Sequence, residues 1–259
     1  MLVKLPATLT VAILSSIVCL IFIWRAGKKP PSLRSFAAID GIPEMVGRCV
    51  EMGRPVLLTP GAYGAAINRP GPMVASLPIM HYVARQCAKY GARLITSIGF
   101  SDTYAAAVPA IESAYRAEGK MELYVPEDII YWGSFEGYLA GNPATIAGEN
   151  VGALIQTGSP ASAGITQNEM AVQVGAMTSC IAPNAGDGLV FYTLCSDYLT
   201  IGEEYYAASA AIAGDRTQLG SIVGTDVLKI AVLAIILIGV ILVAASPDLA
   251  KNLITVLKK

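Results

Sequence analysis

The sequence is poor in the residues on which most enzyme chemistry depends. It has one histidine among 259 residues, 14% charged residues and a formal net charge of −1. A single histidine excludes a metal site built from several histidine ligands. That residue, His81, stands in an apolar helical pattern beside Met80 and Tyr82, so we interpret it as a packing residue rather than a general base. The near-neutral charge gives no electrostatic reason to expect nucleic acid as a partner.

The cysteines form neither a disulfide framework nor a zinc motif. Their number is odd and no two are close in the sequence. Such scattered thiols are typical of a reducing compartment. The five are Cys19, Cys49, Cys87, Cys180 and Cys195.

Glycine-rich phosphate loops are also missing. The stretch from Gly61 to Gly64 is not a G-x-G-x-x-G motif, and no glycine-rich loop ends in Gly-Lys-Ser/Thr. The segment Ser97–Ser101 lacks the two glycines that flank the serine of a nucleophile elbow. We therefore predict no cofactor and assign no catalytic residue.

Two long apolar runs, Ala7–Trp24 and Val227–Ala245, stand at the two ends of the sequence. About 20 apolar helical residues match a hydrocarbon core of roughly 30 Å, so each run predicts a transmembrane helix. A cleaved signal peptide is the alternative for the first run, but the run is long and no A-x-A site follows it. Neither run contains G-x-x-x-G, so we expect these helices to add little to association.

Basic residues set the expected orientation. A cluster between Arg25 and Arg34 follows the first run, which places the central region in the cytoplasm and the protein in the plasma membrane. Lys251, Lys258 and Lys259 follow the second run and oppose this orientation. We follow the first helix because it usually dominates.

These features predict five segments. An N-terminal anchor and a Lys-Lys-Pro-Pro linker precede one α/β domain, and a second transmembrane helix and a tail follow it. The tail is either an interfacial amphipathic helix or a solvated C-terminus. The predicted boundaries are 1–27, 28–35, 36–225, 226–246 and 247–259.

Short apolar runs bounded by glycine alternate with helical patterns through the central region. This alternation predicts βαβ units and a Rossmann-like, mainly parallel sheet with helices on both faces. The expected strands are Val56–Thr59, Leu94–Ser97, Ile129–Trp132, Ala153–Gln156 and Leu189–Leu194. The expected long helices are Gly41–Met52, Val74–Tyr90, Thr103–Glu118, Asn168–Cys180 and Ile201–Ala213.

One segment carries a family resemblance. Cys195–Ala208 has Asp197-Tyr198 followed by Ile201-Gly202-Glu203-Glu204, and Tyr90–Ile95 is similar too. This pattern resembles an uncharacterised prokaryotic membrane-domain family, which pairs a Rossmann-like soluble region with flanking transmembrane helices. The resemblance covers the central region and supports its architecture. It implies no activity and no catalytic residue.

Ligands of doubly wound sheets bind outside the carboxyl ends of the strands. Residues expected at that edge are Gly61, Gly64, Ser101, Asp102 and Asp197. The alternative interpretation is that they are turn residues, with Ser101-Asp102 capping the next helix.

Asp197, Glu203 and Glu204 form a second candidate site, for a divalent cation, because hard cations take oxygen ligands. The alternative is that the two glutamates stabilise the first turn of a helix.

The sequence favours a membrane-anchored, non-catalytic scaffold that binds the lipid bilayer through its two ends and forms homo-oligomers through the surface of its soluble domain. Stretches of small residues with little charge, such as Ala144–Val151 and Gly158–Gly164, are typical of interfaces. The alternatives are a small-molecule-binding enzyme or sensor, and an accessory subunit that binds other membrane proteins.

Overall fold

The chain forms two compact units in the computed structural model, which describes residues 5–28, 35–61, 70–159, 162–184 and 196–245. The α/β unit comprises residues 33–214. The terminal-helix unit comprises residues 1–32 and 215–259.

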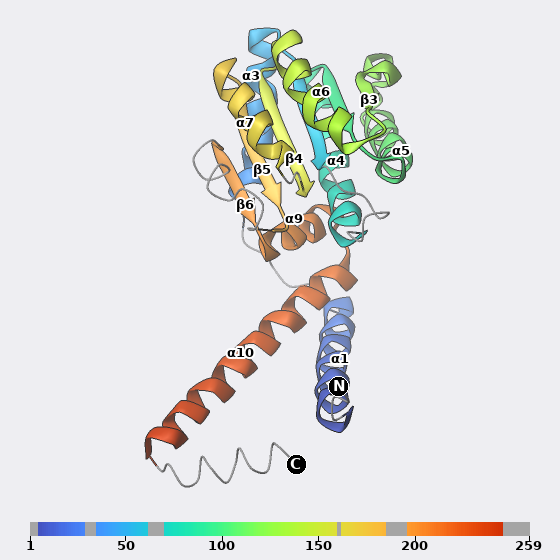
Figure 1. Cartoon of the computed structure of the whole chain (residues 1–259). Coiled ribbons are helices and arrows are strands. Elements are labelled where there is room, and N and C mark those ends of the chain that lie inside the picture. The colour runs from blue at the N-terminus through green and yellow to red at the C-terminus, as the bar shows by residue number, and fades with distance from the viewer. Residues whose placement is uncertain (1–4, 29–34, 62–69, 160–161, 185–195, 246–259) are drawn as a thin grey trace. The chain divides into compact units, whose positions relative to one another are not determined.

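The α/β unit is built on a six-stranded, wholly parallel sheet in the order β3-β2-β1-β4-β5-β6 (Figure 1). The chain reverses its direction across the sheet between β1 and β4, which is the Rossmann arrangement. The prediction of an α/β fold with a parallel sheet is therefore confirmed. The strands are β1 Val56–Gly61, β2 Leu94–Ile98, β3 Ile129–Tyr131, β4 Ala153–Ser159, β5 Met177–Ala182 and β6 Tyr198–Ile201.

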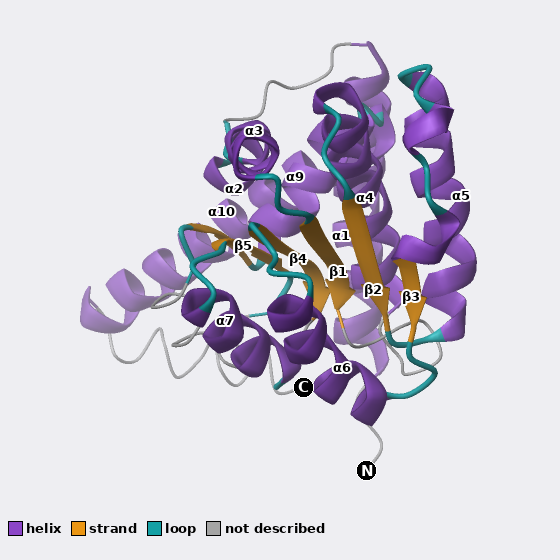
Figure 2. Ribbon diagram, turned by 90° about the horizontal axis from the view of Figure 1, so that it is seen from above, coloured by secondary structure: helices purple, strands orange, loops and turns teal. Residues whose placement is uncertain are grey.

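Helices cover both faces of this sheet (Figure 2). One face carries α6 Phe135–Gly148 and α7 Ala163–Gln173. The other face carries α3 Ile42–Met52, α4 Pro70–Tyr90, α5 Ser101–Ala117 and α9 Glu203–Ala213. The short helices are α2 Ala37–Asp40, η2 Met121–Leu123 and η3 Pro126–Asp128.

Two sequence predictions need correction. The helix expected over Asn168–Cys180 is wrong in its second half, because α7 ends at Gln173 and Met177–Ala182 forms β5. Gly175 has a φ of +70°, which ends the helix, and β5 then pairs with β4. The strand expected over Leu189–Leu194 lies outside the described residues. The last described strand is instead β6, inside the motif that carries the family resemblance.

The face under α6 and α7 changes from apolar to polar along the strands. Leu57, Ile95 and Leu154 pack there in one hydrophobic cluster with Ile146, Val151, Ala171 and Ala176. Side chains two residues apart share a face of a strand. Thr59, Ser97 and Gln156 therefore lie on this face too, one step nearer the carboxyl ends, and all three are buried. A polar layer thus sits under the helices at the edge where Rossmann folds bind ligands.

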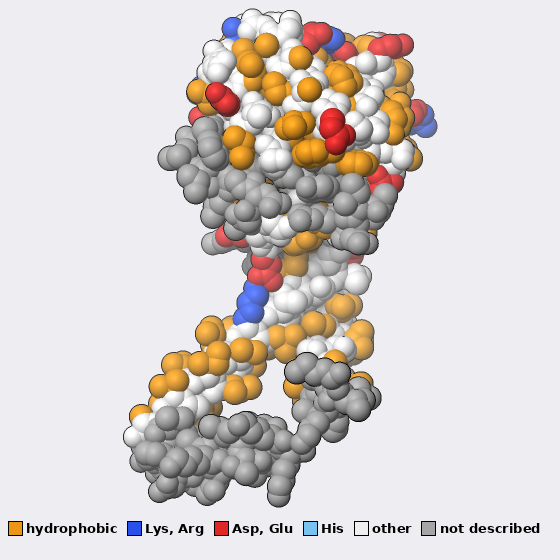
Figure 3. Space-filling view, in the orientation of Figure 1, with side chains coloured by type: hydrophobic (Ala, Val, Ile, Leu, Met, Phe, Trp, Pro, Cys, Tyr) orange, Lys and Arg blue, Asp and Glu red, His pale blue; other side chains and the backbone are white. Residues whose placement is uncertain are grey.

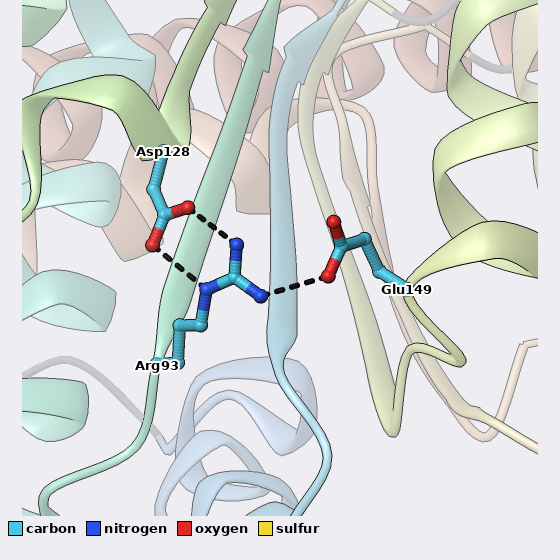
Figure 4. Close-up of polar contacts among 3 residues, drawn as sticks. All are labelled: Arg93, Asp128 and Glu149. Atoms are coloured by element: carbon cyan, nitrogen blue, oxygen red, sulfur yellow. Dashed lines mark hydrogen bonds and ion pairs between the residues drawn. The ribbon is translucent and has the colours of Figure 1, made fainter.

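An ion-pair group joins three elements at the opposite edge of the sheet, where the strands begin (Figure 4). Arg93, just before β2, donates two hydrogen bonds to Asp128 at 2.9 and 2.7 Å and a third to Glu149 at 2.7 Å. These bonds, led by those to Asp128, raise the pKa of Arg93 above its usual range. The group joins β2, η3 and the end of α6, and we interpret it as structural.

The terminal-helix unit consists of α1, Leu5–Lys28, and α10, Arg216–Ala245. Both helices are long and apolar enough to cross a membrane. α10 begins ten residues before the predicted boundary at residue 226. The added turns contain Gly220 and Gly224, a G-x-x-x-G motif that the apolar run alone does not include.

This motif packs against α1. A Cβ atom added at Gly220 would lie 2.7 Å from the Cα of Ile23, and one at Gly224 would lie 3.1 Å from the Cα of Cys19. Arg216 also donates a hydrogen bond to the carbonyl of Gly27 at 3.0 Å. The contacts run in opposite directions along the two helices, so α1 and α10 form an antiparallel pair with backbones in close approach.

Candidate functional site

Two glycines shape the carboxyl edge where β1 meets β4. Gly61 and Gly158 have φ values of +93° and +92°, which favour glycine. A Cβ atom at Gly61 would lie 2.6 Å from the Ser159 nitrogen, and one at Gly158 would overlap the carbonyl oxygen of Pro60. Glycine is therefore the residue that fits at both positions, where β1 and β4 pair at the topological switch point.

A first hydrogen-bond relay lies on the α6–α7 side of this edge. The indole Nε1 of Trp132 donates to Ser97 Oγ at 2.7 Å, and Ser97 Oγ donates to Asn142 Oδ1. An indole N–H only donates, so this end of the relay has a fixed direction. The Nδ2 group of Asn142 is left as the free end of the relay.

A second relay starts from α7. Asn168 Nδ2 donates to the carbonyl of Gly164 at 2.8 Å and to Gln156 Oε1 at 2.7 Å. Gln156 Nε2 then donates to Gln167 Oε1 at 2.7 Å. A backbone carbonyl only accepts, so the Asn168 amide has one orientation and the relay one direction. It ends in the Nε2 group of Gln167.

Both relays end beside Tyr138, whose side chain is fully buried. Burial raises the pKa of this phenol, and the nearby Gln167, Thr59 and Asn142 side chains lower it by a smaller amount. Within the described residues, four polar atoms here have no partner of hydrogen-bond geometry: Thr59 Oγ1, Tyr138 Oη, Asn142 Nδ2 and Gln167 Nε2. We call these four residues the switch-point cluster.

Two glycines hold the aromatic members in place. A Cβ atom at Gly141 would overlap the Trp132 ring, so this glycine lets the indole lie directly on α6. A Cβ atom at Gly99 would lie 3.3 Å from Tyr138 Cβ, tighter than ordinary van der Waals contact. The rings are therefore fixed by packing, which is what a preorganised binding group requires.

The residues expected to bind ligand do not all meet at this edge. Gly61 ends β1 there, and Ser101 and Asp102 begin α5 just after β2. Gly64 lies outside the described residues. The N-cap of α5 is Phe100 rather than Ser101, and Asp102 Oδ1 accepts from the Thr103 amide at 2.8 Å.

Asp197 lies at the amino edge, which corrects its expected position. It precedes β6, and its carboxylate accepts from the Thr178 amide near the start of β5 at 2.7 Å. The prediction placed it after a strand that ends at Leu194, and the structure places it before one.

The proposed cation ligands are separated for the same reason. Asp197 precedes β6, whereas Glu203 and Glu204 follow it in the first turn of α9. Across the described parts of the chain, no three His, Cys, Asp or Glu side chains are arranged to hold a metal ion. The structure thus does not assemble the predicted metal set.

His81 and the described cysteines of the α/β unit lie outside the switch-point cluster. His81 Nδ1 lies 2.9 Å from the carbonyl of Ala110 and joins α4 to α5 on the other face of the sheet. Burial raises the pKa of Cys49 and of Cys180 to about 12, with Arg54 opposing the rise at Cys49. Thiols with such raised pKa values are poor nucleophiles at neutral pH.

These raised pKa values predict alkaline sensitivity. The folded unit holds Cys49 and Cys180 protonated to about pH 12, whereas an unfolded thiol titrates near 9. The unfolded state therefore binds fewer protons above pH 9, and the free energy of unfolding falls as pH rises from 9 towards 12. Buried Tyr205, whose pKa is also raised, acts in the same direction. Denaturant midpoints measured from pH 7 to 11 should be flat at first and then decrease, and a midpoint that rises above pH 9 would contradict this.

Local sequence patterns do not reveal the switch-point cluster. The available signal was a polar residue inside each of two apolar strands, Ser97 in RLITS and Gln156 in ALIQT. Each stands two positions after a buried leucine or isoleucine of the same face.

The fold and this edge define a Rossmann-like α/β protein flanked by two apolar helices. Residues 2–254 match the family described as a domain of unknown function, DUF6754, and the chain belongs to that family. The resemblance to an uncharacterised family is thereby confirmed. No curated protein and no solved structure matches the chain.

Proposed function

We propose that this protein is a membrane-anchored scaffold that self-assembles through the outer surface of α6 and α7. The two terminal helices cross the plasma membrane, and the α/β unit lies on the cytoplasmic side. Anchoring in a plane raises the effective concentration of neighbouring copies and favours lateral contacts.

The outer surface of α6 and α7 supports this proposal because it is poor in charge. The only charged residues in these two helices are Glu136 and Glu169. Ala140, Ala144 and Ala147 are exposed at helical spacing along α6, and Val172 is 55% exposed on α7. Figure 3 shows this face covered mainly by hydrophobic and neutral side chains, with isolated acidic groups. Surfaces of monomers usually intersperse charges of both signs.

Charge insertion tests the assembly. We expect the full-length protein in lipid nanodiscs or mild detergent to sediment as an oligomer. The double variant Ala144→Arg/Val172→Arg should sediment as a monomer, because two unpaired cations would be buried in each contact. Ala105→Arg, at an exposed alanine of α5 on the other face, is the matched control and should stay oligomeric. A wild-type chain that is monomeric at high protein concentration and low salt would refute the proposal.

Site-directed labelling tests the orientation. Single cysteines at Ser32 and Ser246, in a background without the native thiols, should react with an impermeant maleimide from opposite sides of the membrane. The expected pattern protects Ser32→Cys in intact cells and exposes Ser246→Cys, because the cluster from Arg25 to Arg34 stays inside. Reaction of both from the same side would eliminate the two-span topology.

A small-molecule-binding role is the second candidate, and the switch-point cluster favours it.

An accessory role in a complex with other membrane proteins would give a different result in the sedimentation test. The complex purified from cells would contain other chains, and the charge variant would lose them.

A further inference from the structure

We infer that the switch-point cluster is a binding site for the acceptor oxygens of a small carboxyl or amide group. This inference concerns a site under α6 and α7, inside the unit, and does not depend on the proposed assembly. It rests on the direction of the two relays, on the burial of the four side chains and on their position in the fold.

Both relays direct donors into the cluster. The Ser97 hydroxyl accepts from the Trp132 indole and donates to Asn142 Oδ1, which leaves both N–H groups of Asn142 Nδ2 at the cluster end. The Asn168 contact with Gly164 fixes the second relay, which leaves Gln167 Nε2 as its end. Reversing the Gln167 amide would set its Nε2 donor against the Nε2 donor of Gln156, so the orientation of Gln167 follows from the relay.

The cluster therefore holds more donors than acceptors. Two amide groups contribute four N–H bonds, and the Thr59 and Tyr138 hydroxyls contribute two O–H bonds and the two oxygens. All four side chains have no exposed surface, so solvent does not reach these groups from outside. Buried donors without acceptors are unfavourable. A planar group that brings only acceptor oxygens complements this set.

The absence of charge in the cluster defines the ligand class further. All members are neutral hydroxyls or amides, and the described ionisable residues nearest in sequence, Glu136 and Glu169, point to the exposed surface of their helices. A phosphate dianion would lack a compensating cation. A neutral amide or a single carboxylate needs only the neutral donors that are present.

The position matches the site that the fold provides. Thr59 lies on β1, and Gln156, which supports Gln167, lies on β4. These strands flank the topological switch point, where doubly wound sheets bind ligands at the carboxyl edge. Gly61 and Gly158 lie at the same carboxyl edge, and each is packed against the backbone of the neighbouring strand.

Thermal unfolding of the full-length protein in detergent tests the site with two probes, sodium acetate and acetamide, at constant ionic strength. Either probe should raise the unfolding temperature of the α/β unit in a saturable manner, since a ligand that binds only the folded state stabilises it. A response to acetate indicates a carboxylate ligand, and a response to acetamide indicates a neutral amide. Absence of a saturable response to either probe would overturn the inference.

Variants assign the response to the cluster. Tyr138→Phe and Thr59→Val each remove one hydroxyl with little change of shape, and Gln167→Met removes one amide. Each should reduce the probe affinity at least about tenfold, the effect of losing one hydrogen bond of about 1.4 kcal/mol. Thr166→Ala, at the neighbouring exposed position of α7, should keep the wild-type response. Equal responses in the wild type, Tyr138→Phe and Thr59→Val would overturn the inference even if Gln167→Met failed to fold.

Discussion

Replacing Gly158 by alanine is expected to destabilise the α/β unit by about 3 kcal/mol or more. The residue has a φ of +92°, a conformation that costs an L-residue roughly 1–3 kcal/mol. Its new Cβ atom would also overlap the carbonyl oxygen of Pro60, a backbone atom that cannot rotate away. Separating β1 from β4 at this point would disturb the central pair of the sheet.

Trp132 is a convenient reporter for this experiment. The chain has two tryptophans, so a Trp24→Phe background leaves Trp132 as the only fluorophore of its kind. The midpoint temperature of thermal unfolding, followed by Trp132 fluorescence, should be about 10 °C lower in Gly158→Ala. This is the shift that ~3 kcal/mol produces in a domain of about 180 residues. Gly47→Ala is the control, because nothing lies within 4 Å of its added Cβ in α3. It should be neutral or slightly stabilising. Equal effects of the two alanines would contradict this explanation.

Replacing Gly220 by leucine is expected to separate α1 from α10. The first side-chain atom would already lie 2.7 Å from the Cα of Ile23 and 2.8 Å from the Cβ of Ala26. The helices would have to move apart, and the close backbone contact that stabilises such pairs would be lost. Gly239 stands on the same helix with open space around it, so Gly239→Leu should leave the pair intact.

A native cysteine makes this separation measurable. A Cβ atom at position 224 would lie 3.5 Å from Cys19 Sγ, so Gly224→Cys should form a disulfide with Cys19 under mild oxidation. Mass mapping of the linked peptides gives the yield. Adding Gly220→Leu should lower the yield about tenfold, because overpacking costs 1–3 kcal/mol. A high yield that Gly220→Leu does not change would show that the helices do not depend on this motif for their contact.

Local patterns predicted the part of the fold that local forces determine. The first four strands were found because each is a short apolar run ended by glycine or a turn, as in Leu94–Ile98. The error at Met177–Ala182 arose because Met favours helices and Thr favours strands, so this segment has no clear strand pattern of its own. Only pairing with β4, a long-range contact, decides for the strand.

The candidate site was harder to predict because its parts come from five separate elements. Thr59, Ser97 and Gln156 are single polar residues within apolar strands, which a sequence reading assigns to turns or tolerates as exceptions. Tyr138 and Asn142 share one face of α6, but periodicity does not reveal which strand residues they meet. The relay directions in particular need coordinates, since they depend on which atom of each amide faces its neighbour.

The contact between α1 and α10 has a consequence for folding. Arg216 and Gly27 are 189 positions apart and are joined by a hydrogen bond. The chain between them therefore forms a loop that is closed by the α1–α10 pair, which we call the clasp. Covalent closure of a loop on the order of 100 residues removes about 4.7 kcal/mol of unfolded-chain entropy. The clasp can remove part of this entropy without a covalent bond, but only while α1 and α10 remain in contact. During synthesis α1 is made before the α/β unit and α10 after it, so the two helices can meet only once the whole unit has been made. The finished protein should consequently unfold more slowly than the sheet alone, and opening of the clasp would release that restraint in one step.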